Sequence, residues 1–163
     1  MTTEKLTHKD LVEIGYKWAL SRCGFAFKEL VVISGFGEIP DVIGFNHLGT
    51  FVLEAKTSRA DFKKDKTKTI RKMPEYGMGD WRFYICEKGL IKIDELPEMW
   101  GLIEVNEKAK AITTYNPFGK GNIYSRWKRN QKHKESEQWV MYSALRRLQE
   151  KKLLEHVYPE KPK

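Results

Sequence analysis

Three charged residues lie within a stretch of sequence that otherwise has the character of a β-sheet. Asp41 falls near the start of one apolar run, residues 39–45, and Glu54 and Lys56 fall near the end of the next, residues 50–57. Both runs are rich in β-branched and aromatic residues, and the four residues between them have turn chemistry. The stretch predicts a β-hairpin that carries charges where a sheet normally places apolar side chains.

The register of this hairpin brings the two acids together. A symmetric loop predicts three cross-strand pairs: Phe45 with Thr50, Ile43 with Val52, and Asp41 with Glu54. Opposed side chains have Cβ atoms about 4.5 to 5.5 Å apart, a spacing at which like charges repel. Strand periodicity puts Lys56 on the same face as Glu54. Paired carboxylates suit Mg²⁺ or Mn²⁺, and a nearby ammonium can orient a water or stabilise charge on a phosphate, so the pattern outlines a hydrolytic site.

An exposed hairpin with a Glu–Lys pair on its solvent face is the structural alternative. Against it, both faces of the hairpin carry apolar residues. One face has Ile43, Phe45 and Val52, and the other has Val42, Phe51 and Leu53. Strands that are apolar on both faces are typical of the centre of an α/β sheet, where helices cover each side.

The motif resembles that of the PD-(D/E)XK nuclease superfamily. It consists of Pro40-Asp41, a gap of twelve residues, and Glu54-Ala55-Lys56. The resemblance implies an α/β fold with a restriction-endonuclease-like core: a helix, a three-stranded meander, a helix and a further strand, in a central mixed sheet flanked by helices. It also implies that Asp41, Glu54 and the Ala55 carbonyl hold Mg²⁺, which Mn²⁺ can replace, and that Lys56 positions the attacking water.

Two further acids are candidates for the same site. In the superfamily the first helix often contributes an acidic metal ligand, and Glu13 is the residue of this chain best placed for that role; an ordinary surface role is the alternative. Glu38 stands at the entrance of the hairpin, where a solvated strand-edge role is the alternative. The chain after Glu-Ala-Lys, including Leu96-Pro97 and Gly101-Leu102-Ile103, is similar to small bacterial DNA-repair proteins of the MmcB-like group over residues 38–105.

Periodicity and capping residues predict the remaining elements. Thr7 and Asp10 can cap a helix over residues 9–22, and Ser58 can cap a second helix after the hairpin. The other predicted elements are a strand over residues 25–34 with a turn at 35–37, strands Trp81–Glu87 and Met99–Val105, and a helix over 137–154 packed through Val140, Ala144, Leu145 and Leu148. We expect one domain over residues 1–156 and a flexible tail over 157–163.

The charge of the chain indicates an anionic partner. Its 163 residues carry a formal net charge of +8, and nucleic acid is favoured over membrane because no amphipathic anchor or apolar span is visible. Basic residues gather after the hairpin and again near residue 126, where an aromatic residue is interleaved; the alternative is a solvated loop. The predicted nucleic-acid contacts are Lys63, Lys64, Lys66, Arg71, Lys72, Arg126, Trp127, Lys128 and Arg129.

The sequence therefore predicts a Mg²⁺-dependent endonuclease that hydrolyses DNA, in repair or in phage and host defence, with RNA left open as a substrate. The alternative is an accessory protein that binds nucleic acid on the same fold without cleaving it. Cys23 and Cys86 are far apart, with no metal-binding or signal-like pattern, so a reducing cytoplasm is expected. The oligomeric state stays open, and a homodimer is one of the alternatives.

Overall fold

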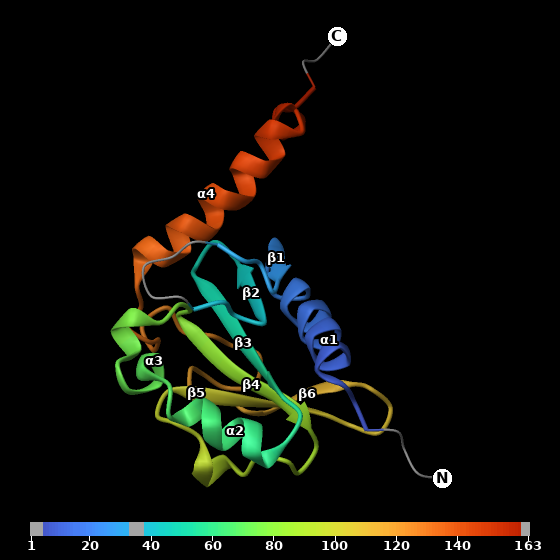
Figure 1. Ribbon diagram of the computed structural model, residues 1–163, viewed down its shortest axis with the longest axis vertical. Helices are drawn as coiled ribbons and strands as arrows, with labels where there is room; N and C mark the ends of the chain where they lie inside the picture. The colour runs from blue at the N-terminus through green and yellow to red at the C-terminus, as the bar shows by residue number, and fades with distance from the viewer. Residues whose placement is uncertain (1–4, 33–37, 161–163) are drawn as a thin grey trace.

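The computed structural model describes residues 5–32 and 38–160, and its centre is a six-stranded mixed sheet (Figure 1). The strands are β1 (Phe25–Lys28), β2 (Val42–Phe45), β3 (Thr50–Lys56), β4 (Trp81–Glu87), β5 (Trp100–Val105) and β6 (Ala111–Tyr115), and they adjoin in that order. The β3–β4 and β4–β5 pairs are parallel and the other three are antiparallel. The predicted α/β class, with a mixed sheet packed against helices, is confirmed.

The first helix, α1 (His8–Leu20), covers one face of the sheet. Its predicted cap is confirmed, since the Thr7 hydroxyl accepts from the Asp10 N–H and the Asp10 carboxylate accepts from the Thr7 N–H. The helix ends at Leu20, two residues before the predicted end. A Cβ on Gly15 would lie 3.1 Å from the Leu53 side chain, so this glycine lets the helix approach β3 closely.

β2 and β3 form a hairpin with the predicted register. β1, which pairs with β2, is shorter than predicted. β1 ends at Lys28, well before the predicted end at residue 34, because Glu29 adopts a left-handed conformation with φ of 45°. β2 begins at Val42, three residues after the predicted start, since Pro40 has no N–H for a sheet ladder. The end of the predicted strand and the turn at 35–37 fall at residues 33–37, which lie outside the described residues.

The second face of the sheet is covered by the segment that follows β3. Ser58 caps α2 (Arg59–Lys66) through the Asp61 N–H, as predicted. Phe62 on this helix packs edge-on against Tyr84 of β4, whose ring stacks on Trp100 of β5. The short helices α3 (Thr69–Lys72), η1 (Pro74–Tyr76) and η2 (Ile93–Glu95) complete this layer of the structure.

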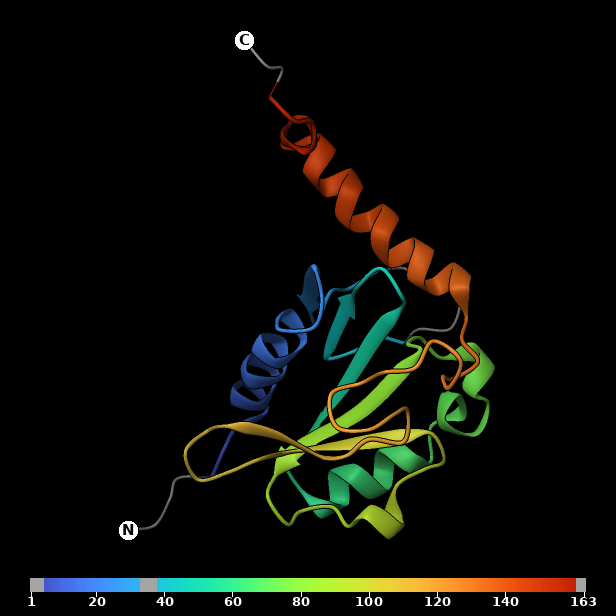
Figure 2. The same ribbon diagram turned by 180° about the vertical axis from the view of Figure 1, so that it is seen from behind.

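The C-terminal part of the chain differs most from its prediction. β6 was not predicted, because its sequence Ala-Ile-Thr-Thr-Tyr is only weakly apolar and it lies at an edge of the sheet. The last long helix, α4 (Lys134–Glu150), runs away from the sheet in both views (Figures 1 and 2) and is followed by η3 (Leu154–Val157). Of its predicted packing residues only Val140 is buried, and Leu145 and Leu148 are exposed.

No helix among the described residues is long and apolar enough to cross a membrane. Residues 157–160 are described, and the last three residues of the predicted tail, 161–163, lie outside the described part of the chain. The flexibility of the tail and the boundary of the domain at residue 156 therefore stay predictions.

Candidate active site

The hairpin loop sets the register that brings the two acids together. The Asn46 side chain accepts from the N–H groups of Leu48 and Gly49, and the Asn46 N–H donates to the Gly49 carbonyl. The predicted pairs Phe45 with Thr50 and Ile43 with Val52 are confirmed. Asp41 lies one residue before the start of β2, and the same register, continued by that residue, sets Asp41 opposite Glu54.

The backbone around Asp41 leaves one carbonyl facing the site. Asp41 Oδ2 accepts from the Ala55 N–H at 2.7 Å. Because the N–H and C=O of a strand residue point to the same edge, the Ala55 carbonyl also faces the β2 side. The register sets Pro40 opposite Ala55, and proline has no N–H to donate. The proline of the motif therefore keeps the Ala55 carbonyl free of a ladder bond from its opposite residue.

A histidine and a second acid adjoin Asp41 on its other side. His8 Nε2 lies 3.4 Å from Asp41 Oδ1 and 3.2 Å from Glu29 Oε1. One ligand atom from each of the three residues lies within 4.8 Å of the others, and among the described residues this is the one such group suited to a metal ion. Neither His8 nor Glu29 was predicted, since His8 is a single residue at a helix start and Glu29 reaches Asp41 only because β1 ends there.

The first helix contributes His8 to the site where the resemblance implied Glu13. The Glu13 carboxylate is paired with Lys28 at the surface, and this hydrogen bond lowers the pKa of Glu13. Glu13 is not part of the group around Asp41. The physical reason is position on the helix, because His8 in the first turn of α1 lies beside Asp41, whereas Glu13 lies beside Lys28.

Glu54 and Lys56 project from one face of β3 into a buried cluster of charges. Lys56 Nζ lies 3.6 Å from Glu54 Oε2 and 3.3 Å from Asp65 Oδ1, and both carboxylates are buried. Lys56 is therefore held between two acids, one on its own strand and one on α2.

Arg71 is the second cation of this cluster, and the prediction that it contacts nucleic acid is corrected. Its guanidinium lies 3.3 Å from both Glu38 Oε1 and Glu54 Oε2 and 2.7 Å from Asp65 Oδ2, with 3% of the side chain exposed. Its guanidinium is buried and engaged by three carboxylates of the protein, so it is part of the charge cluster and not a surface contact. Glu38 also accepts from the Met78 N–H, so it is a buried member of the cluster and not a solvated strand-edge residue.

Asp65 was missed by the sequence analysis, although it is the most connected residue of the cluster. It accepts from Arg71 and from the Tyr84 hydroxyl, and Lys68 pairs with it at 2.9 Å. One signal was available, since Asp65 follows Phe62 by three residues and a capped helix puts both on its packed face. The cluster at the C-terminal end of β3 is hereafter the Glu54 cluster and consists of Glu38, Glu54, Lys56, Asp65 and Arg71.

The environment shifts the pKa values of the acids in different directions. Burial raises the pKa of Glu54 to about 7, the Arg71 charge opposes this, and the nearby Asp41 charge adds to it. Burial also raises the pKa of Asp41, against the Ala55 hydrogen bond. Burial alone would raise the pKa of Asp65, but hydrogen bonding and charge from Arg71 hold it well below its usual range. Glu54 and Asp41 therefore have raised pKa values, which a bound cation would lower, whereas the pKa of Asp65 is already low.

A cavity of about 420 Å³ opens onto Glu54. It is lined by Glu38, Ile39, Glu54 and the segment from Lys68 to Arg71. Other hollows are of similar size, such as one of about 460 Å³ beside Arg22 and Tyr124. What singles out the cavity at Glu54 is its chemistry, since an ionisable carboxylate with a raised pKa forms its wall.

The predicted nucleic-acid contacts divide between two ends of β3. Lys63, Lys64 and Lys72 are exposed on α2 and α3, beside the Glu54 cluster, and Lys66 is exposed but donates to the Glu95 carbonyl. The segment from Arg126 to Arg129 lies near the opposite end, where Arg129 donates to the Leu48 carbonyl of the hairpin loop. Trp127 is 82% exposed and Arg126 lies over its ring.

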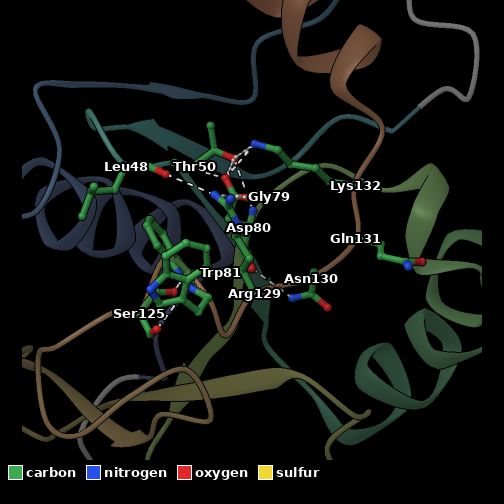
Figure 3. A network of polar contacts seen from close by, with 12 residues as sticks. Leu48, Thr50, Gly79, Asp80, Trp81, Ser125, Arg129, Asn130, Gln131 and Lys132 are labelled. Atoms are coloured by element: carbon green, nitrogen blue, oxygen red, sulfur yellow. Dashed lines mark hydrogen bonds and ion pairs between the residues drawn. The ribbon is translucent and has the colours of Figure 1, made fainter.

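A second polar cluster lies at the N-terminal end of β3 (Figure 3). Lys132 Nζ lies 2.6 Å from Asp80 Oδ2 and 2.7 Å from Glu137 Oε2, and the Thr50 hydroxyl donates to Glu137. Asp80 also accepts from the Thr50 N–H, and Glu137 from the Gly79 N–H. This Asp80 cluster, consisting of Thr50, Asp80, Lys132 and Glu137, fastens the segment before α4 to the sheet.

Comparison with known proteins defines the fold of the chain. No family model matches it, and no curated protein matches it. Among solved structures it is similar to the SPO1766 protein of unknown function from Silicibacter pomeroyi, with 24% identity and a TM-score of 0.56 over 90% of this chain and 92% of that one. A likeness at this identity shows a shared fold, so the chemistry of the site has to be inferred from its own residues.

Proposed function

We propose that the protein is a metal-dependent nuclease that hydrolyses phosphodiester bonds of DNA. The observation that carries the proposal is the register of β2 and β3, which continued by one residue sets Asp41 opposite Glu54, with Lys56 beside Glu54 and a cavity leading to Glu54. The order of helix, three antiparallel strands, helix and parallel strand supports it, because this is the core that the resemblance to the PD-(D/E)XK superfamily implies.

The residues at the site fit a divalent cation. Asp41 and Glu54 offer carboxylate oxygens and Ala55 offers a carbonyl, which are the ligands preferred by Mg²⁺ and Mn²⁺. His8 adds an imidazole beside Asp41, and a nitrogen ligand favours Mn²⁺ over Mg²⁺. Burial raises the pKa values of both acids, and a bound cation would lower them.

Lys56, Asp65 and the exposed lysines each have a distinct role in the proposed reaction. A bound divalent cation would supply Lewis acidity toward a phosphate and would lower the pKa of a water. Lys56 carries a positive charge to the point where negative charge builds up on the scissile phosphate. Asp65, through its contact with Lys56 Nζ, holds that ammonium in place, and exposed lysines on α2 and α3 attract the DNA backbone.

A second candidate function is binding of nucleic acid without cleavage. One observation favours it: Arg71 and Lys56 lie 3.3 and 3.6 Å from Glu54, so two protein cations already offset the charge of that carboxylate. In a pure binding protein these ion pairs would serve only to hold β3 and α3 together. We place either activity in a reducing cytoplasm, since Cys23 and Cys86 are both free thiols.

Lys56→Ala separates the two candidates. A catalytic lysine acts mainly on the transition state, so the variant should lose cleavage at least a hundredfold while DNA affinity and metal affinity stay nearly unchanged, a loss of about 2.7 kcal/mol in transition-state binding. The assay supplies Mg²⁺ or Mn²⁺ with duplex, single-stranded and branched DNA, and with RNA. Binding is measured in Ca²⁺ beside it.

Lys64→Ala is the matched control, because Lys64 is an exposed lysine on α2. It should lower cleavage only as far as it lowers DNA binding. If the wild-type protein binds these substrates and cuts none of them with either metal, the nuclease proposal fails and the binding function replaces it. If Lys56→Ala lowers thermal stability, binding and cleavage alike, Lys56 has a structural role.

A further inference from the structure

Residues 126–128 form a short loop whose two ends are fixed to the sheet. Before the loop, the Ser125 carbonyl accepts from Trp81 Nε1 at 3.2 Å, and after it the Asn130 N–H donates to the Asp80 carbonyl at 2.8 Å (Figure 3). Trp81 and Asp80 are both buried, at and just before the start of β4. The sheet therefore determines where this loop stands on the surface.

The loop holds the side chain of Trp127 in solvent. With 82% of it exposed, it is the most exposed of the large apolar side chains that the structure describes. The Arg126 guanidinium lies over one face of the ring, 4.8 Å from its centroid, and the exposed fraction leaves the other face to water. Within the described residues, Trp127 belongs to none of the three apolar clusters, so the ring adds little to the stability of the fold.

The chain around Trp127 is strongly basic. From residue 116 to residue 134 the sequence has six Lys and Arg residues and no Asp or Glu. Arg126 and Lys128 are exposed on either side of the tryptophan, and in the described part of the chain neither of them pairs with a carboxylate. A single exposed apolar residue is ordinary on a protein surface, but an open aromatic face between two such cations favours a ligand that carries both phosphates and flat rings.

The ligand that fits these features best is an unpaired stretch of nucleic acid. Bases inside a duplex are stacked on both faces, so their rings are not open to Trp127. An unpaired base has a free face that stacks on an aromatic side chain with little regard to sequence. Beside the loop lies a hollow of about 460 Å³, of which Trp81 forms one wall, and none of its lining residues is acidic. A strand that continues from Trp127 into this hollow therefore meets no negative charge.

A membrane surface and a protein partner fit the loop less well. A loop that enters a bilayer needs neighbouring apolar residues, and both sequence neighbours of Trp127 are charged. The core of a protein interface gathers several apolar side chains away from charge, whereas here a guanidinium already covers one face of the single aromatic ring in the loop. Nucleic acid is therefore the favoured occupant.

We propose that Trp127 is a stacking site for an unpaired base, and that the protein binds DNA that contains a single-stranded stretch. The inference rests on the proposed function in taking DNA as the ligand, and it adds which form of DNA is bound. Trp127 belongs neither to the Glu54 cluster nor to the group around Asp41. Binding of an unpaired base and cleavage can therefore be measured separately.

The first experiment measures dissociation constants of the full chain by fluorescence anisotropy, without divalent cations so that no probe is cut. The probes are a labelled oligothymidylate of about 15 nucleotides and a blunt duplex of the same length. Trp127→Ala should raise the dissociation constant for the single strand at least about fivefold, the lower end of the range for one stacked base. For the duplex it should change by less than about twofold, because Arg126 and Lys128 still contact phosphates.

Two variants serve as controls. Trp139→Ala makes the same chemical change at another exposed tryptophan, on α4, and should leave both dissociation constants unchanged. Trp127→Phe keeps an aromatic face at the loop and should recover most of the affinity for the single strand. Circular dichroism verifies that all of these variants are folded.

Stacking also has a spectroscopic signature, because a base stacked on an indole quenches its fluorescence. The oligothymidylate should quench the tryptophan fluorescence of the wild type and of Trp139→Phe, and it should quench that of Trp127→Phe far less. A merely structural role of Trp127 would not produce this difference between the two variants.

Three results would overturn the inference. The first is a Trp127→Ala variant that binds the single strand as tightly as the wild type. The second is an equal loss of affinity for both probes, which would give Trp127 a structural role. The third is an affinity for vesicles of phosphatidylserine that depends on Trp127, with no such dependence for the single strand, which would assign the loop to a membrane surface.

The outcome is separable from that of the nuclease proposal. If no substrate is cut with Mg²⁺ or Mn²⁺ but Trp127→Ala loses affinity for the single strand alone, the nuclease proposal fails and the stacking site stands. If DNA is cut and Trp127→Ala binds both probes as the wild type does, the stacking site fails and the nuclease proposal stands.

Discussion

The two ends of the central strand β3 carry buried polar clusters that are built differently. In the Asp80 cluster, two acids face Lys132 and the partly exposed Arg129, so charges balance, and backbone N–H groups of Thr50 and Gly79 take up further carboxylate oxygens. In the Glu54 cluster, three acids face two buried cations and the partly exposed Lys68, Asp41 adds a fourth acid nearby, and a cavity leads to Glu54.

The difference in charge balance between the two clusters indicates that they have different roles. A balanced, hydrogen-bonded cluster fixes the position of a segment, and here it holds the chain before α4 against the sheet. In the Glu54 cluster, which lies beside a cavity, burial instead holds the charged form of Glu54 in an unfavourable state, shown by its raised pKa. Such a state is expected where a cation completes the site.

The largest effect should follow from breaking the balanced cluster. Asp80→Ala removes a buried carboxylate that accepts from Lys132 and from the Thr50 N–H, and removal of one partner of a buried ion pair typically costs about 3 to 5 kcal/mol. Urea unfolding should show a loss of that size. Asp61→Ala, at a partly exposed acid on α2, is the control and should change stability by less than about 1 kcal/mol. Equal losses in both variants would show that the ion pair of Asp80 stabilises the fold no more than that of a partly exposed acid.

A substitution in the Glu54 cluster is expected to raise the stability of the metal-free protein rather than lower it. In the folded metal-free protein the pKa of Glu54 is about 7 against an ordinary 4.5, so the folded state binds more protons between these values and stability falls as pH rises through that window. Glu54→Gln removes this cost. At pH 8 it should stabilise the metal-free protein, by at most about 3.5 kcal/mol at about 1.4 kcal/mol per pKa unit.

At a pH below both pKa values the wild type and Glu54→Gln should have the same stability. Thermal unfolding in the presence of a chelator, repeated at several pH values, measures the difference between them. A variant that is less stable than the wild type at pH 8 would show that the ion pairs of Glu54 with Arg71 and Lys56 outweigh its burial.

Metal affinity should depend on pH for the same reason. A cation must displace the proton of Glu54, so Mn²⁺ affinity measured by calorimetry should fall about tenfold per pH unit below pH 7 and level off above it. Glu54→Gln and Asp41→Ala should each abolish this binding. Glu137→Gln, in the balanced cluster, should leave it unchanged, and a loss of affinity in that variant would locate the metal at the wrong end of β3.

The smallest effects concern DNA binding at the two ends. Replacing Lys63 and Lys64 by Gln, or Arg126 and Lys128 by Gln, should lower affinity regardless of DNA sequence, and each lost phosphate contact should flatten the salt dependence by about one unit. Titrations at several salt concentrations measure both pairs. An unchanged slope for one pair would show that the charges at that end of the strand are only solvated.

Local rules predicted the hairpin and its neighbours well. The cap at Thr7, the cap at Ser58, the strand Trp81–Glu87 and the cross-strand register depend on residues close together in sequence, and all are confirmed. The packing predicted for α4 was wrong, because an apolar stripe on a helix indicates burial without indicating the partner. The register, extended to Asp41 and Glu54, gave the centre of the candidate site.

The rest of the site depends on contacts between distant segments. Arg71 resembles any other residue of a basic run, and only the fold shows that it lies among three carboxylates. His8 and Glu29 meet Asp41 because a helix start, a strand end and a hairpin converge at one point. No spacing rule predicts such meetings from a single sequence.

Anomalous diffraction from a crystal soaked with Mn²⁺ tests the central claim most directly. We predict a strong peak within coordination distance of the Asp41 and Glu54 carboxylates, absent from Glu54→Gln crystals of the same form. No peak there at a Mn²⁺ concentration that occupies other sites in the crystal, or a peak confined to the Asp80 cluster, would contradict the account.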